Sequence, residues 1–155
     1  GSEVRYYHDV VGVNSRLDSM QAAILRIKLR QLDDYGKARQ RAAAFYDQAF
    51  AGMEHVHTPE RSADSTHVFH QYTLRITGGH RDALKAHLEA NSIPAMVYYP
   101  VPLHLQKAYE GYGIKRGDLP VTEQLMDEVL SLPMSTELDH EQLTHITTTV
   151  KSFFQ

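Results

Sequence analysis

Apolar residues between positions 17 and 32 follow a pattern that a single surface helix does not need. Placed on a helix at about 100° per residue, they form two stripes on different sides. The first stripe is Leu17, Met20, Ile24 and Ile27, and the second is Ala22, Leu25, Leu29 and Leu32. We therefore expect a helix held between two packing partners, such as its own core and either a second domain or a second subunit. The alternative is a central core helix within this domain.

A second helical pattern lies between residues 33 and 52. Asp33 and Asp34 offer an N-cap and negative charge in the first turn, and Gly52 is expected to end the helix. The apolar positions that recur at helical spacing are Tyr35, Ala38, Ala42, Phe45 and Ala49. Residues 54–66, EHVHTPERSADST, have the composition of turns and predict a loop.

Two strands and three further helices are predicted in the rest of the chain. Residues 67–77 alternate with a period of two and are rich in β-branched and aromatic types, which is typical of a strand. Residues 93–100, IPAMVYYP, predict a second strand between prolines. Helices are expected over 80–92, 122–132 and 135–154, with a helical turn and loop over 101–113. This order indicates an α/β or α+β sandwich with a small sheet.

Composition narrows the classes of function. The 155 residues suit one domain, and the apolar (42%) and charged (23%) fractions are ordinary for a globular protein. The net charge of −3 argues against nucleic acid as the main partner, because backbone binding needs clustered positive charge. No apolar run approaches the roughly 18 residues of a membrane span, so no membrane partner is expected. Gly1-Ser2 is expected to be an expression remnant rather than a signal peptide.

The chain has no cysteine and an excess of histidine. The lack of cysteine excludes disulfides, thiolate metal sites and cysteine nucleophiles, and it is compatible with a cytoplasmic protein. The ten histidines raise the question of a metal site, which needs three or four ligands brought together. No H-E-x-x-H motif is present, and His67 and His70 would lie on opposite faces of a strand. We therefore expect no bound metal.

Several motifs occur in an order that resembles a known family. They are YYHDVVGVNSRLDSMQAAILRIKL from Tyr6, VFHQYTLRI from Val68, SIPAMVYYPVPLHLQKAY from Ser92 and LPVTEQLMDEVLSLPM from Leu119. Together they are similar to the C-terminal half of the nucleotide-sugar aminotransferases, the DegT family, over nearly the entire chain. These are pyridoxal-phosphate (PLP) enzymes of the aspartate-aminotransferase fold, fold type I. The resemblance implies an α/β fold, with an α+β small domain in which helices flank a small sheet.

The same resemblance indicates what lies outside this chain. In the family the lysine that forms the Schiff base precedes the Asn-x-Arg turn, in a Ser-x-x-Lys setting followed by glycines. None of the lysines here has that setting, and the acidic partner of the pyridinium nitrogen is also an upstream feature. We therefore expect a C-terminal fragment that is inactive alone. Residues 1–2 would be the expression remnant, 3–32 the inter-domain or dimer turn and helix, and 33–155 the small C-terminal domain.

The implied activity belongs to the parent protein. The resemblance implies a homodimeric, cytoplasmic aminotransferase that moves an amino group, with glutamate as donor, onto a nucleotide-linked keto sugar for amino-sugar and surface-polysaccharide biosynthesis. Two alternatives stay open. Some relatives carry histidine in place of the lysine and dehydrate the sugar instead. A non-catalytic binding or assembly module would also lack the lysine.

Asn14 and Arg16 are the candidates for binding anionic groups. Asn14 matches the family asparagine that reaches a neighbouring subunit and contacts the cofactor phosphate, and an amide donor suits a phosphate oxygen. The local alternative is a turn that caps the helix, shared with Ser15 or Asp18. Arg16 matches an active-site arginine near the nucleotide sugar, and its planar fork suits phosphate or carboxylate. Its alternative is a surface salt bridge with Asp9 or Asp18.

Further candidates for substrate binding come from the third motif. Tyr99 matches the family tyrosine of the substrate pocket, and Tyr98 stands where the family usually has histidine. A phenol can donate a hydrogen bond to a sugar hydroxyl but carries no charge near neutral pH. His104 is a candidate for a partial substrate contact, and His8 for the dimer side of the pocket. Aromatic packing, loop structure and surface placement are the respective alternatives.

Overall fold

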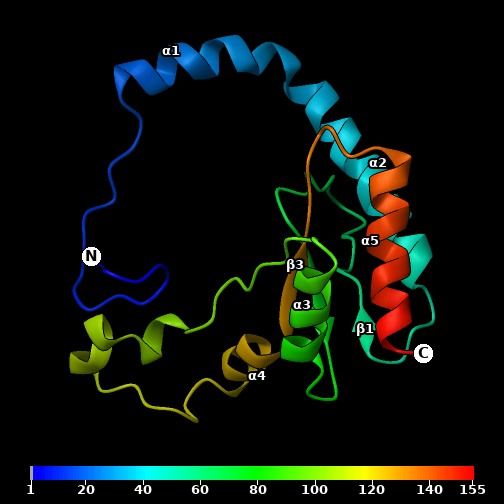
Figure 1. The fold of residues 1–155 in the computed structure, drawn as a ribbon. Helices are drawn as coiled ribbons and strands as arrows, with labels where there is room; N and C mark the ends of the chain where they lie inside the picture. The colour runs from blue at the N-terminus through cyan, green and yellow to red at the C-terminus, as the bar shows by residue number, and fades with distance from the viewer. Residues whose placement is uncertain (1) are drawn as a thin grey trace.

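The computed structural model describes residues 2–155, so Gly1 and its part in the expected expression remnant lie outside the described residues. The elements in chain order are α1 (Ser19–Lys28), η1 (Leu29–Gln31), α2 (Leu32–Phe50), β1 (Val56–His57), β2 (Tyr72–Ile76), α3 (Arg81–Ala90), η2 (Leu103–Leu105), η3 (Lys107–Tyr112), α4 (Pro120–Glu128), β3 (Val129–Leu132) and α5 (His140–Phe153). Figure 1 shows a body built from α2 to α5, from which α1 extends away.

The core lies between a small antiparallel sheet and helices. The strands are ordered β1-β2-β3, with Val56 opposite Ile76 and Leu74 opposite Leu130. Alternate residues of β2 are buried, and α2, α3 and α5 pack together on this core (Figure 1). The fully buried large side chains are Tyr46, Phe50, Phe69, Tyr72, Leu74, Ile76, Leu84, Leu88, Leu130 and Val150. The predicted α/β class with a small sheet flanked by helices is confirmed.

The predicted strand over 67–77 forms only from Tyr72 to Ile76. Phe69 has φ 46°, a left-handed conformation that ends an extended ladder. The amide of Phe69 donates to Nδ1 of His67 at 2.9 Å, so the backbone bonds locally instead of to a neighbouring strand. The strand prediction was therefore too long. The predicted loop over 54–66 was also wrong in one detail, because β1 lies within it and pairs with β2.

Two further predictions assigned the wrong type of element to part of the chain. The predicted helix over 122–132 ends at Glu128, and Val129–Leu132 forms β3 against β2. The predicted strand over 93–100 makes only a bridge, in which Met96 and Ser131 exchange hydrogen bonds of 3.0 and 2.7 Å. Short apolar runs fit either type of element, and here the ladder with β2 selects the strand.

Capping side chains fix one end of helix α3 and one end of helix α5. Helix α3 closes at Asn91, whose side-chain amide donates to the carbonyl of His87 at 2.8 Å. Helix α5 starts at a capping box of Asp139 and Gln142, later than the predicted start at 135. Helix α2 begins at Leu32 without a side-chain cap, so the predicted N-cap at Asp33 or Asp34 was wrong. Both residues lie in the first turn, as the predicted negative charge there requires.

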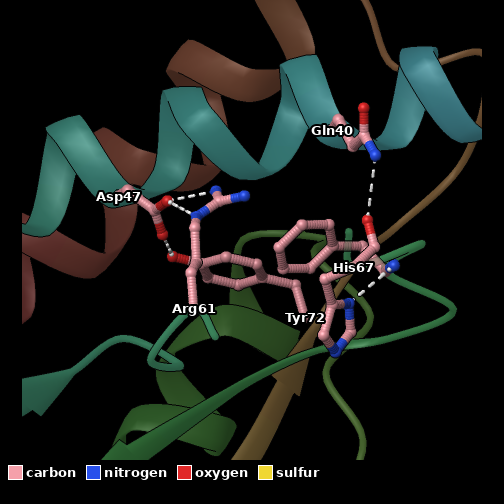
Figure 2. Close-up of polar contacts among 6 residues, drawn as sticks. Gln40, Asp47, Arg61, His67 and Tyr72 are labelled. Carbon is pink, nitrogen blue, oxygen red and sulfur yellow. Dashed lines mark hydrogen bonds and ion pairs between the residues drawn. The ribbon is translucent and has the colours of Figure 1, made fainter. Parts of the chain in front are cut away.

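The loop between β1 and β2 is fixed to helix α2 by a polar network (Figure 2). Asp47 accepts a hydrogen bond of 2.6 Å from the Tyr72 hydroxyl and is paired with the Arg61 guanidinium. The same guanidinium lies 4.6 Å from the ring centre of Phe69. Burial, followed by the hydrogen bond to Asp47, raises the pKa of Tyr72 above its ordinary value. The network keeps Tyr72 protonated and the loop closed over the core.

Helix α1 behaves differently, because none of its residues is buried. Met20 is 76% exposed, Ile24 58% and Leu25 52%, so both predicted stripes face away from the core of this chain. The central-core alternative is therefore wrong, and so is the expectation that one stripe packs on the chain's own core. Among residues 2–155, no helix is long and apolar enough to cross a membrane.

Candidate functional site

The largest cavity found among the described residues has a volume of about 1330 Å³. It lies between the N-terminal arm, which we define as residues 2–18, the segment that carries η2 and η3, and helix α4. Figure 1 shows the arm returning from α1 to lie beside this segment, far from the rest of the body. Every residue singled out for binding in the sequence lines the cavity: His8, Asn14, Arg16, Tyr98, Tyr99 and His104.

Asn14 and Arg16 project from the arm as exposed side chains. Within residues 2–155 neither side chain forms a hydrogen bond or an ion pair. Helix α1 is capped by Asp18, whose carboxylate accepts from the Gln21 amide at 2.7 Å. Asp9 pairs instead with Lys107 at 3.2 Å. The local roles considered for Asn14 and Arg16, a helix cap and a salt bridge, are therefore filled by other residues or not formed.

Three tyrosines form one aromatic wall of the cavity. The ring of Tyr6 meets the edges of Tyr98 and Tyr99 at centroid distances of 5.8 and 5.3 Å. Tyr6 has φ 70°, a conformation that costs a non-glycine residue on the order of 1–3 kcal/mol and persists only where its surroundings hold it. Partial burial, followed by the neighbouring Tyr6, raises the pKa of Tyr98. Tyr98 is therefore uncharged near neutral pH and can supply a phenolic hydrogen bond.

His104 is buried and already has a partner. Its Nε2 lies 3.0 Å from Oε1 of Glu123, and Glu123 also accepts from the Gly117 amide at 2.8 Å. The hydrogen bond from His104, followed by that from Gly117, lowers the pKa of Glu123. These bonds fasten η2 to the start of α4. They leave Nδ1 as the only ring nitrogen of His104 for a ligand.

Gln106 holds the arm in place, a role that no sequence pattern predicted. Its Nε2 donates to the carbonyls of Tyr6 and Val101 at 2.8 and 3.1 Å, and its Oε1 accepts from the His8 amide at 2.8 Å. The Ala108 amide adds a 3.0 Å bond to the His8 carbonyl. A glutamine has no spacing rule that predicts such contacts, so only the folded chain identifies it.

Two kinds of catalytic group are not found at this site. No lysine is among the residues that line the cavity. Among residues 2–155 there is also no group of three histidine, aspartate or glutamate side chains that could hold a metal ion. The cavity can therefore bind anionic and hydroxylated ligands through the side chains named above, but it offers no amine nucleophile of its own.

Solved structures share this fold. DesV from S. venezuelae, crystallised in complex with a ketimine intermediate, superposes with a TM-score of 0.83 at 39% identity, over 99% of this chain and 41% of that one. A DegT DnrJ EryC1 StrS aminotransferase from Brucella abortus superposes with a TM-score of 0.79 at 40% identity, over 98% of this chain and 40% of that one. The fold is thus that of part of a sugar-aminotransferase-type protein. The chain belongs to the DegT/DnrJ/EryC1/StrS aminotransferase family, whose model matches residues 1–151.

Curated relatives match with similar coverage. A "Pleiotropic regulatory protein" of Geobacillus stearothermophilus is 45% identical over 100% of this chain and 42% of its own length. A UDP-N-acetyl-3-dehydro-alpha-D-glucosamine 3-aminotransferase of Acidithiobacillus ferrooxidans is 43% identical over 97% of this chain and 40% of its own length. The chain therefore spans about two fifths of the length of these relatives. The predicted family is confirmed.

Proposed function

We propose that this chain is the C-terminal part of a PLP-dependent aminotransferase that transfers an amino group, from glutamate, to a nucleotide-linked keto sugar. The observation that carries the proposal is the cavity, in which unpaired Asn14 and Arg16 on the arm face the tyrosine wall. Family membership and relatives named as UDP- and dTDP-sugar transaminases support the same reaction class. The product would feed amino-sugar and surface-polysaccharide biosynthesis in the cytoplasm.

The residues present fit the phosphate of PLP. Asn14 has a free amide donor and Arg16 a planar guanidinium, and both suit phosphate oxygens. Asp18 already occupies the Gln21 amide at the start of α1, so we assign the contact to side chains instead of the helix terminus. In the proposed enzyme Asn14 donates to the phosphate of a cofactor held mainly by a neighbouring subunit. The cofactor, when bound, would supply an electron sink for the carbon atom that loses or gains the amino group.

The remaining residues of the cavity would bind the substrate. In the proposed enzyme Arg16 neutralises an anionic oxygen of the nucleotide sugar, and Tyr98 and Tyr99 donate hydrogen bonds to sugar hydroxyls; all three residues line the cavity. His104 offers Nδ1, because Glu123 engages its Nε2. A neutral tyrosine at position 98 favours a sugar without a carboxylate at the contacted carbon, since the phenol offers no positive charge to pair with a carboxylate.

Other parts of the reaction need groups outside this chain. No lysine lines the cavity, so the Schiff-base lysine would come from the upstream region, as would the acidic partner of the ring nitrogen. Residues 3–32 would form the inter-domain and dimer segment, and 33–155 the small domain. The exposed stripes of α1 would be covered by the rest of a homodimer. Glutamate would enter the same site as amino donor.

The test uses the full-length protein, including the residues upstream of this chain. We expect an absorbance band in the visible or near ultraviolet after adding PLP, and amino transfer from glutamate to a UDP- or dTDP-linked keto sugar. Loss of the sugar hydroxyl without amino transfer would identify the dehydratase alternative. A preparation that stays colourless after adding the cofactor would overturn the proposal and favour a non-catalytic module.

A further inference from the structure

Gln106 is a buried polar side chain whose three hydrogen bonds all go to backbone groups. Two of these groups belong to Tyr6 and His8, about a hundred residues away in the sequence, and the third to Val101. Only 4% of Gln106 is exposed. The buried side chain therefore joins the N-terminal arm to Val101, just after the tyrosines of the wall.

The arm depends on few other contacts. Besides Gln106, the Ala108 amide donates to the His8 carbonyl at 3.0 Å, and Lys107 pairs with Asp9 at the surface. An exposed ion pair contributes about 0–1 kcal/mol, so Lys107 is a weak tether. Tyr6 keeps its left-handed backbone while its carbonyl accepts from Gln106. The rings of Tyr98 and Tyr99 hold the Tyr6 side chain by packing, whereas the hydrogen bond from Gln106 holds its backbone carbonyl.

The residue type at position 106 fits the task closely. The primary amide supplies two donors and an acceptor, which the two carbonyls and one amide of the backbone require. A glutamate has the same shape but would face the carbonyls of Tyr6 and Val101 with oxygens, and a leucine would leave all three backbone groups without partners. Both changes are predicted to release the arm.

We propose that Gln106 is a positioning residue that sets the distance between the arm and the tyrosine wall, and hence the fit of the nucleotide sugar in the cavity. It touches no reacting group. Gln106 also lines the cavity, but its amide is used by backbone groups, so we infer that it acts through the placement of Tyr6 and His8 on the arm side. The part of the inference that concerns the sugar rests on the proposed function, whereas the part that concerns the arm does not.

The first measurement concerns the arm alone. In the 155-residue chain, hydrogen exchange of the His8 and Ala108 amides is followed by NMR in Gln106→Leu and Gln106→Glu. We expect both amides to exchange about tenfold faster in either variant, while the Leu74 amide in the sheet keeps its protection. Gln124→Leu is the matched control, since Gln124 is exposed and bonds only Glu128 on its own helix. Unchanged protection at His8 and Ala108 would overturn the inference.

The second measurement uses the full-length enzyme. We expect Gln106→Glu to raise the KM for the nucleotide sugar about tenfold, with KM for glutamate and kcat changed by less than about threefold. Gln124→Leu should match the wild type. Equal changes in both KM values, or none, would overturn the positioning role even if the arm is released. An inactive wild type would count against the proposed function, and the exchange measurement would still decide the role of Gln106 in the arm.

Discussion

Helices α1 and α3 have the same length of ten residues and differ in what covers them. Helix α3 has one apolar stripe and buries Leu84 and Leu88 completely. Helix α1 has two stripes and buries nothing, with Leu25 52% exposed and Ile27 71% exposed. The apolar stripe of α3 is thus covered within the chain. The sequence of α1 has apolar surface for partners that the chain itself does not contain.

An excess of apolar residues on a helix indicates a partner outside the chain when the chain's own core does not cover them. A contiguous exposed apolar surface of this kind marks an interaction site in soluble proteins. The arm that carries Asn14 and Arg16 is joined directly to α1, and the two candidate ligand groups also lack partners within residues 2–155. Unsatisfied apolar and polar groups therefore occur together in residues 2–31. The body from α2 onward contains the core and the closed polar networks.

The largest expected effect comes from removing one leucine from each helix. Leu88→Ala in α3 should lower the free energy of unfolding of the 155-residue chain by about 2–5 kcal/mol, because it opens a cavity in the core. Leu25→Ala in α1 should lower it by less than about 0.5 kcal/mol, since the side chain is exposed. Urea denaturation measures both. Similar losses in the two variants would contradict the comparison.

Alkaline pH should destabilise the body through its buried tyrosines. Burial raises the pKa of Tyr46 and, together with Asp47, that of Tyr72 above the ordinary value of 10.0. The folded chain then holds protons that the unfolded chain loses. The contribution of these two tyrosines to the free energy of unfolding is therefore fully present below pH 10, and it is lost as pH rises above 10. Each group contributes a slope of about 1.4 kcal/mol per pH unit. Unfolding measured between pH 9 and 11 should show this slope reduced in Tyr72→Phe, and an unchanged slope would contradict the assignment.

An intermediate effect is expected from the network that closes the loop onto α2. Asp47→Ala leaves the Tyr72 hydroxyl and the Arg61 guanidinium without their shared acceptor, which should cost about 1–3 kcal/mol of unfolding free energy. Asp34→Ala is the matched control on the same helix, because Asp34 is exposed and pairs only with Lys37 at 3.8 Å. Chemical denaturation should separate the two variants. Equal stability would mean that the network contributes nothing.

The smallest expected effect on folding, and a direct one on association, comes from charging α1. The 155-residue chain should self-associate at high concentration through its exposed stripes, and Ile27→Glu should weaken this association with little change in stability. Val68→Glu is the control, since Val68 is equally an exposed apolar residue but lies outside α1. Sedimentation velocity over a concentration series measures the association. A wild type that stays monomeric throughout would contradict the role given to the stripes.

Local signals predicted part of the fold well. Helix α3 ends where Asn91 predicts, because the capping side chain is adjacent in sequence. Strand β3 was missed, since Val129–Leu132 continues the apolar pattern of α4 and only pairing with β2 makes it a strand. Strand β1 was missed because it is only two residues long inside a polar loop, and pairing with β2 alone makes it a strand. Elements fixed by a distant partner were therefore the ones that local patterns could not predict.

The candidate site divides in the same way. The order of the motifs predicted four of the candidate binding residues, and the structure brings their distant segments to one cavity. These residues are Asn14, Arg16, Tyr98 and Tyr99. Their roles toward cofactor and substrate stay predictions. Gln106 could not be found from the sequence, because its role exists only once the arm lies beside the wall. The hydrogen bond of His104 to Glu123 likewise depends on the placement of α4.

The most direct test of the account is the dissociation constant of PLP for the full-length protein and its Asn14→Asp variant. The change preserves size and replaces the amide NH2, the donor group of the side chain, with a carboxylate oxygen next to an anionic phosphate. A lost hydrogen bond to a charged group costs about 1.5–3 kcal/mol, so the account predicts affinity weaker by about tenfold or more, with an unchanged free energy of unfolding. Equal affinity of the two proteins for PLP would contradict the claim that the arm supplies a phosphate ligand.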